Sequence, residues 1–188
     1  HSYDVRENYG SVPAEILNKY DLVIWETGYR DRPLENDGHS QGQSQAQVLN
    51  YFLTSGGALW LISPGISESA LETIDSGISY VGYEEEYIGG ITALENPYVN
   101  LTLHNGELLK DALVDRIGVS SNKVVYAEPS GSTTAKLLFS TDGTSRGLSV
   151  SDVIKNENRR GKFVFMGFEL SRVKHYYSQN FIGYRILQ

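Results

Sequence analysis

The residues from Ala58 to Ser67 read A-L-W-L-I-S-P-G-I-S and carry most of the information about the fold. An apolar strand that runs straight into a tight turn is typical of α/β enzymes, which hold a nucleophile at the carboxyl end of the sheet. Ser63 occupies that turn. The oxyanion hole of such a site uses the backbone N–H of the next residue, and here that residue is Pro64, which has no N–H. We therefore expect a corner with the shape of a catalytic site that lacks one of its donors.

A helix and a second apolar strand precede this stretch. Asp21–Glu26 reads D-L-V-I-W-E, a continuous apolar run of the kind found where both faces of a sheet are covered. Gln45–Ser55 has the periodicity of an amphipathic helix, with capping-box spacing between Ser44 and Gln47 and a glycine pair from Gly56 to end it. Strand, helix and strand in this order predict a βαβ unit with parallel strands.

The remaining segments extend the α/β pattern. Lys162–Phe168 is another fully apolar run and is predicted to be a central strand, whereas Glu107–Ile117 has the apolar stripe of a helix. Further helices are expected at Val12–Tyr20, at Ser67–Ser76 and from Ser171 to about Leu187, and further β segments at Ser2–Val5, Ile78–Tyr83, Ile88–Leu94, Tyr98–Leu103, Lys123–Ala127, Ala135–Ser140 and Gly147–Val150. These elements predict one α/β domain over residues 1–188, a three-layer sandwich whose mostly parallel sheet carries an added β meander.

Composition narrows the classes of function. The chain has 188 residues, of which 40% are hydrophobic, as in an ordinary globular domain. Its net charge of −7 argues against nucleic acid as a partner, because nucleic-acid binding needs a basic surface. The absence of cysteine excludes disulfides, thiolate metal sites and cysteine nucleophiles. No apolar run is long enough to span a membrane. No glycine-rich phosphate loop is present either, and for this reason we expect no nucleotide or flavin cofactor.

Three segments together resemble a known family. They are Y-D-L-V-I-W-E-T-G at Tyr20–Gly28, the helix end at Gly56 before A-L-W-L-I-S, and G-K-F-V-F-M-G-F-E at Gly161–Glu169. They resemble the flavodoxin-like, class I glutamine amidotransferase-like domains that occur as accessory modules of secreted and cell-surface proteins of archaea and bacteria, often beside peptidase domains. The resemblance implies an extracellular or cell-surface location, with partners in the same polypeptide or another chain. Such domains usually begin with one more strand and helix, so it also implies that residues 1–188 are a fragment lacking that unit.

The amidotransferases of this family place a cysteine in an I-C-x-G turn and a His-x-Glu pair after a later strand. The resemblance puts Ser63 at the position of the cysteine and Glu169 at that of the acid, but no histidine stands two residues before Glu169. His39, in a polar loop near the carboxyl ends of the strands, is the histidine that could approach as a base. A small ligand at this end of the sheet would be bound by Thr27, Gly28, Tyr29, Ser63, Gly65 and Glu169.

Two acidic segments are candidate calcium sites. The polar loop contains Asp31, Glu35 and Asp37, whose oxygens suit calcium although their spacing is not that of an EF-hand. The second segment is Glu84–Glu86. Neighbouring side chains of a strand point to opposite faces, so at most two of these three carboxylates converge.

The leading interpretation is a non-catalytic accessory or interaction domain of a larger extracytoplasmic protein, possibly attached to a peptidase. The alternatives are a hydrolase or amidotransferase-like enzyme that uses Ser63, and a calcium- or small-ligand-binding module.

Overall fold

The structure is a computed structural model of the chain, and it describes residues 12–28, 34, 44–85, 98–103, 108–115, 123–131, 134–141, 147–156, 158–173, 179–180 and 182–183. Its elements are, in chain order, α1 (Ala14–Leu17), β1 (Leu22–Glu26), α2 (Gln45–Thr54), β2 (Ala58–Ile62), α3 (Glu68–Ile74), β3 (Ile78–Glu85), β4 (Tyr98–Leu103), β5 (Leu108–Asp115), β6 (Lys123–Pro129), β7 (Lys136–Thr141), β8 (Gly147–Asn156), β9 (Arg159–Met166) and the 3-10 turn η1 (Leu170–Arg172).

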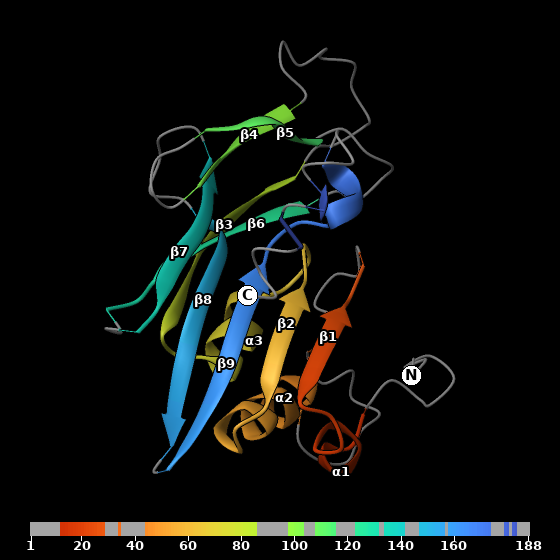
Figure 1. Cartoon of the computed structure of the whole chain (residues 1–188), viewed down its shortest axis with the longest axis vertical. Helices are drawn as coiled ribbons and strands as arrows, with labels where there is room; N and C mark the ends of the chain where they lie inside the picture. Colours follow the sequence, from red (N-terminus) through yellow and green to blue (C-terminus); the bar gives the residue numbers. More distant parts are fainter. Residues whose placement is uncertain are drawn as a thin grey trace.

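The strands of the described residues form one nine-stranded sheet with two kinds of pairing. β1, β2 and β9 are parallel, with Ile24 opposite Trp60 and Trp60 opposite Val164. From β9 onward the order is β8, β7, β4 and β5, and each of these pairs is antiparallel. β6 joins the first residue of β8 and pairs with β3 on its other side. Figure 1 shows the parallel strands in the lower half of the molecule and β4 and β5 at the upper end.

This topology confirms the α/β class, and it confirms the strand β9 as central, between β2 and β8. It does not confirm a three-layer sandwich built on a mostly parallel sheet. The reason is the short connection between β8 and β9, which makes the two strands an antiparallel hairpin and leaves only β1, β2 and β9 parallel. The β4–β5 pair lies at the far edge of the sheet as an addition, but β3 pairs with β6 and is not part of one meander with them.

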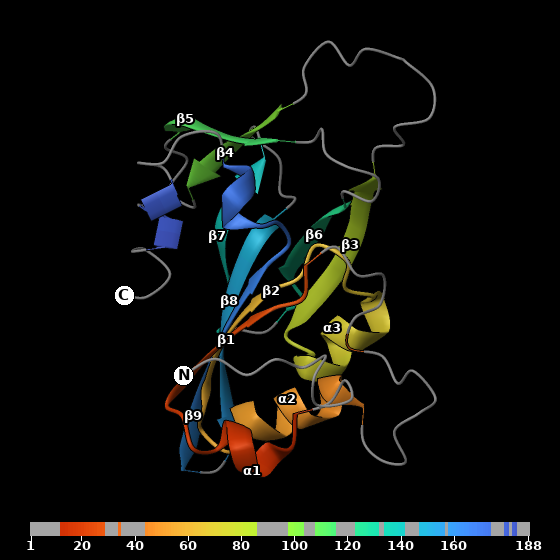
Figure 2. The ribbon, with the colours of Figure 1, turned by 90° about the vertical axis from the view of Figure 1, so that its right-hand side faces the viewer.

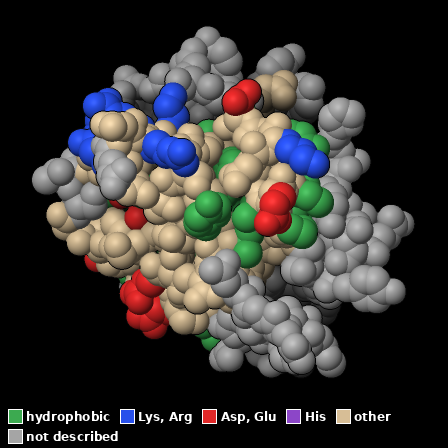
Figure 3. Space-filling view, turned by 90° about the horizontal axis from the view of Figure 1, so that it is seen from below, with side chains coloured by type: hydrophobic (Ala, Val, Ile, Leu, Met, Phe, Trp, Pro, Cys, Tyr) green, Lys and Arg blue, Asp and Glu red, His purple; other side chains and the backbone are tan. Residues whose placement is uncertain are grey.

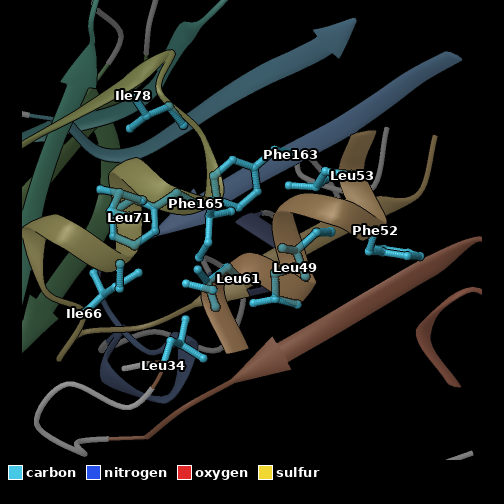
Figure 4. Close-up of a cluster of buried hydrophobic side chains, with 14 of the residues drawn as sticks. Leu34, Leu49, Phe52, Leu53, Leu61, Ile66, Leu71, Ile78, Phe163 and Phe165 are labelled. Atoms are coloured by element: carbon cyan, nitrogen blue, oxygen red, sulfur yellow. The ribbon is translucent and has the colours of Figure 1, made fainter. Parts of the chain in front are cut away.

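The two faces of the sheet bury separate apolar clusters. Leu59 and Leu61 of β2 pack with Phe163 and Phe165 of β9 under α2 and α3, as Figure 4 shows for the centre of this cluster. Trp60 and Ile62 point to the opposite face because side chains alternate along a strand. There they join the second cluster, whose other members are Val124, Tyr126, Phe139, Met166, Phe168, Val173 and Ile182. Figure 2 shows α2 and α3 together on one side of the parallel strands.

Helix α2 begins as its sequence predicts. The Ser44 hydroxyl accepts a hydrogen bond from the Gln47 backbone N–H (3.3 Å), and the Gln47 side-chain oxygen accepts one from the Ser44 N–H (2.8 Å), which completes the capping box. Gly56 follows the helix with a φ of 100°, a conformation that glycine adopts without strain. The expected βαβ unit from β1 through α2 to β2 is therefore present.

The expected helix at Glu107–Ile117 is wrong. Leu108–Asp115 form the strand β5, and β4 supplies its backbone hydrogen-bond partners. A short apolar run fits helical and extended periodicities almost equally, and pairing with a neighbouring strand then settles the conformation. After β9 the chain forms η1, and of the expected helix from Ser171 to Leu187 the structure describes helical conformation only at residues 179–180 and 182–183. The predicted segments Ser2–Val5 and Ile88–Leu94 lie outside the described residues.

Candidate functional site

The candidate site lies where the three parallel strands end. Glu26, Ile62 and Met166 are aligned across β1, β2 and β9, so the segments that follow them leave the sheet at the same edge. Ligands of open α/β sheets bind outside the carboxyl ends of the strands. Two backbone hydrogen bonds continue the sheet for one more residue, from the Thr27 N–H to the Ile62 oxygen (3.0 Å) and from the Ser63 N–H to the Met166 oxygen (2.9 Å).

The Ser63 side chain is fully buried, with 0% of its surface exposed. Its hydroxyl accepts a hydrogen bond from the Thr27 hydroxyl at 2.9 Å, and the Thr27 hydroxyl also lies 3.1 Å from the Gly28 carbonyl oxygen. Both of these groups are neutral and neither is a base. A serine hydroxyl needs an adjacent base to act as a nucleophile near neutral pH. In this arrangement the hydroxyl joins the ends of β1 and β2 and receives no activation from Thr27.

The backbone around Ser63 offers few donors to an oxyanion. The Ser63 N–H is already used by the Met166 carbonyl, and Pro64 has no N–H to donate. Pro64 and Gly65 are themselves buried. Oxyanion holes work through preorganised donors that point at the developing charge, and the loss of one such donor typically costs about 10²–10³-fold in rate.

Glu169 interacts with another carboxylate at this edge of the sheet. Glu26 is only partly buried, and this partial burial and, second, the negative charge of Glu169 raise its pKa above the usual value. The Glu169 carboxylate accepts a hydrogen bond from the Ser171 hydroxyl at 3.1 Å. Glu26 belongs to the run D-L-V-I-W-E, which indicated a strand and gave no sign of a role at the site. Its position as the last residue of β1, at the edge of the sheet where the site lies, is the feature of the sequence that could have identified it as a site residue.

The structure brings only part of the predicted set together. Thr27 and Ser63 are in contact, and Gly28 adopts a left-handed conformation with a φ of 59° directly after Thr27. Tyr29 lies outside the described residues, as do His39 and the other three histidines. The predicted use of Ser63, Glu169 and His39 in catalysis therefore stays a prediction.

The predicted calcium ligands Asp31, Glu35 and Asp37 also lie outside the described residues, as do Glu86 and the side chains of Glu84 and Glu85. Within the part of the chain that the structure describes, no group of three or more histidine, aspartate or glutamate side chains could hold a metal ion. Within the same part, no helix is both long enough and apolar enough to cross a membrane.

The chain was compared with known proteins. No protein-family profile and no curated protein matches it. Among solved structures it is similar to Gan42B, a GH42 β-galactosidase from G. stearothermophilus, with a TM-score of 0.53 and 11% identity over 91% of this chain and 22% of that one. It is also similar to the cold-adapted β-galactosidase from Rahnella sp. R3, with a TM-score of 0.50 and 13% identity over 89% of this chain and 22% of that one. A cytoplasmic protein from Salmonella typhimurium matches 93% of this chain and 74% of its own length, with a TM-score of 0.45 and 14% identity.

These neighbours correct two expectations from the sequence. The resemblance to flavodoxin-like, amidotransferase-like accessory domains is wrong, because the similar structures are regions of GH42 β-galactosidases. The segments that carried it encode strands that end in tight turns, a pattern shared by many α/β sheets, and the pairing from β9 onward is antiparallel. The expected extracellular or cell-surface location likewise finds no support among the similar structures, two of which are named cytoplasmic proteins. Neither an attached peptidase nor secretion has support in the comparisons, and the chain spans about a fifth of the length of the β-galactosidases it matches.

Proposed function

We propose that this chain is a non-catalytic accessory domain that contacts other protein domains, in the same polypeptide or in another chain. The observation that carries the proposal is the burial and hydrogen bonding of Ser63. Its hydroxyl is buried against Thr27, its N–H is used by Met166, and the next residue is a proline. The comparison with the β-galactosidases supports the same view, because the region they share with this chain is about a fifth of each enzyme.

A contact role is supported by the surface of β1. Leu22 and Ile24 are 43% and 54% exposed, and both point to the face opposite α2, since Ile24 is aligned with Trp60. On the lower end of the molecule, where α1 and α2 lie, exposed hydrophobic side chains likewise stand among acidic and basic ones (Figure 3). A surface that mixes apolar groups with charges of both signs suits contact with protein better than contact with a uniformly charged polymer.

Labelling with a fluorophosphonate probe tests whether Ser63 is inert. We expect no labelling of the native protein at Ser63, because the hydroxyl is buried and has no base among the described residues. Ser63→Ala is the matched control, since it removes the hydroxyl with the smallest change of shape. Stoichiometric labelling that is lost in the Ser63→Ala variant would support the alternative, an enzyme that uses Ser63, and would contradict the proposal.

Hydroxyl-radical footprinting of the native full-length protein tests the contact role. We expect Leu22 and Ile24 to react several-fold more slowly than their exposed fractions in this chain imply, because a partner domain covers them. Tyr51 on α2 is also 54% exposed and serves as the internal control after normalisation for intrinsic reactivity. If Leu22 and Ile24 react as freely as Tyr51, β1 is not a contact surface.

A further inference from the structure

Two buried acidic side chains from distant parts of the chain lie close enough to interact electrostatically. Asp75 directly follows α3 and is 5% exposed, and Asp152 of β8 is also 5% exposed. Asp152 is aligned with the buried Phe163, so it points to the face of the sheet that α2 and α3 cover. A buried ionised carboxylate is costly unless it is paired or well hydrogen-bonded.

The hydrogen bonds of this pair leave one oxygen without a donor. Asp75 Oδ1 accepts from the Gly77 N–H at 2.8 Å, and Asp152 Oδ1 accepts from the Val153 N–H at 2.7 Å. Asp75 Oδ2 is buried and has no donor among the described residues. Only a carboxyl group that holds a proton can donate a hydrogen bond, so a proton on Asp75 Oδ2 would allow it to donate to Asp152.

Among the side chains that the structure describes, no buried cation accompanies the two carboxylates. Helix α2 has no charged residue, and the first residues of β3, from Ile78 to Tyr80, are uncharged. The charged residues of the other packed elements whose side chains are described are all exposed, namely Glu68, Glu72, Glu128, Lys136, Lys155, Arg159, Arg160 and Lys162. Lys162 is aligned with Val153 and therefore lies on the opposite face of the sheet from Asp152. Burial, and after it the charge of Asp152, raise the pKa of Asp75 to about 6, although the Gly77 N–H acts in the opposite direction.

The pair lies at a junction between several elements. The Asn50 side chain of α2 donates to the Ile74 carbonyl at 2.9 Å, immediately before Asp75. The Ser130 N–H, directly after β6, donates to the Gly77 carbonyl at 2.9 Å, and the Ser130 hydroxyl donates to the Ser76 carbonyl. A change at Asp75 therefore acts on the ends of α3 and β3 and on their links to α2 and β6.

We propose that Asp75 and Asp152 form a proton-operated latch that holds the α3–β3 junction against β8, closed while the two carboxylates share a proton and weakened when the proton leaves. The folded state binds this proton more tightly than an opened state, in which Asp75 titrates near its ordinary value of 3.8. The stabilisation is therefore complete below pH 3.8 and is lost as the pH rises through about 6.

Hydrogen exchange of the full chain between pH 4 and 7.5 tests the latch, with protection factors measured for the peptide that covers residues 74–80. We expect the opening constant of this peptide to rise about thirtyfold from pH 4 to pH 6 and about twofold further by pH 7.5, where it levels off, because the pKa of Asp75 is 3.8 in the opened state and about 6 in the folded state. Asp75→Asn removes the pH dependence, because the amide accepts from Gly77 and donates to Asp152 at every pH. Glu72→Gln, one turn earlier on the same helix, is the matched control and keeps the wild-type profile.

Asp152→Asn provides an independent variant if Asp75→Asn does not fold. It places an amide donor opposite Asp75 and raises protection of residues 74–80 at pH 7 above that of the wild type. A flat wild-type profile between pH 4 and 7.5 would overturn the proposal. So would an Asp75→Asn or Asp152→Asn variant whose profile is as steep as that of the wild type.

Discussion

The environment of Ser63 shows how the neighbours of a hydroxyl set its chemistry. In a nucleophile turn the serine is exposed, a base lies beside its oxygen, and two backbone N–H groups stay free. Here the oxygen faces the Thr27 hydroxyl, and the Ser63 N–H extends the pairing between β2 and β9. The Ser63 hydroxyl therefore links the ends of the parallel strands β1 and β2.

Gly161 is a single residue on which the packing of α2 depends. A Cβ atom at this position would overlap the Leu53 carbonyl oxygen of α2, so glycine permits the backbones of helix and strand to approach. We expect Gly161→Ala to lower the free energy of unfolding by about 1–3 kcal/mol in urea denaturation, because α2 must shift outward. Gly183→Ala is the control, since a Cβ there meets no atom within 4 Å. Equal stability of the two variants would show that α2 adapts without cost.

At the scale of elements, α2 depends on interactions that lie close together in the sequence. We expect Ser44→Ala to reduce the stability of the protein by about 1 kcal/mol, because it leaves the Gln47 N–H without its capping oxygen. The midpoint of thermal unfolding measures the effect. Gln47→Glu is the control: it keeps an acceptor for the Ser44 N–H, adds a negative charge near the positive end of the helix, and should unfold at or above the wild-type midpoint. A Ser44→Ala variant with the wild-type midpoint would contradict the cap's role.

The strand β5 shows the opposite case, an element that depends on distant residues. Its apolar residues between Leu108 and Val114 match a helical stripe, and nothing local opposes that interpretation. The pairing of Val99 with Val114 and of Asn100 with Leu113 provides the backbone partners that make it a strand. Its neighbour β4 in turn pairs with β7, about 40 residues along the chain, which no short window of sequence can indicate.

At the scale of the whole molecule, one sheet joins two apolar clusters. Trp25 packs against the cluster under α2 and α3, and Trp60 belongs to the cluster on the opposite face. These are the two tryptophans of the chain, so each reports on one face. If residues 1–188 are a single domain, as the sequence predicts, both faces must lose their packing in one transition.

We therefore expect one cooperative unfolding transition. Trp25→Phe leaves fluorescence from Trp60 alone, and Trp60→Phe leaves fluorescence from Trp25 alone. In each variant, the midpoint in urea by fluorescence should equal the midpoint by far-ultraviolet circular dichroism of the same variant, which serves as its internal control. Midpoints that differ between the two signals would show that one face unfolds before the other and would contradict a single domain.

Short-range patterns were sufficient to locate β1, α2, β2 and β9, because caps, glycine ends and apolar runs act within about one helical turn or one strand. They also located the turn at Ser63 and the proline that removes a donor. Long-range pairing established the rest: the antiparallel half of the sheet, the Thr27–Ser63 bond across 36 residues, and the burial of Asp75 beside Asp152. Each of these contacts joins residues that are remote in the chain. It contributes to stability only after the sheet has formed and brought those residues together, so no short stretch of sequence can indicate it.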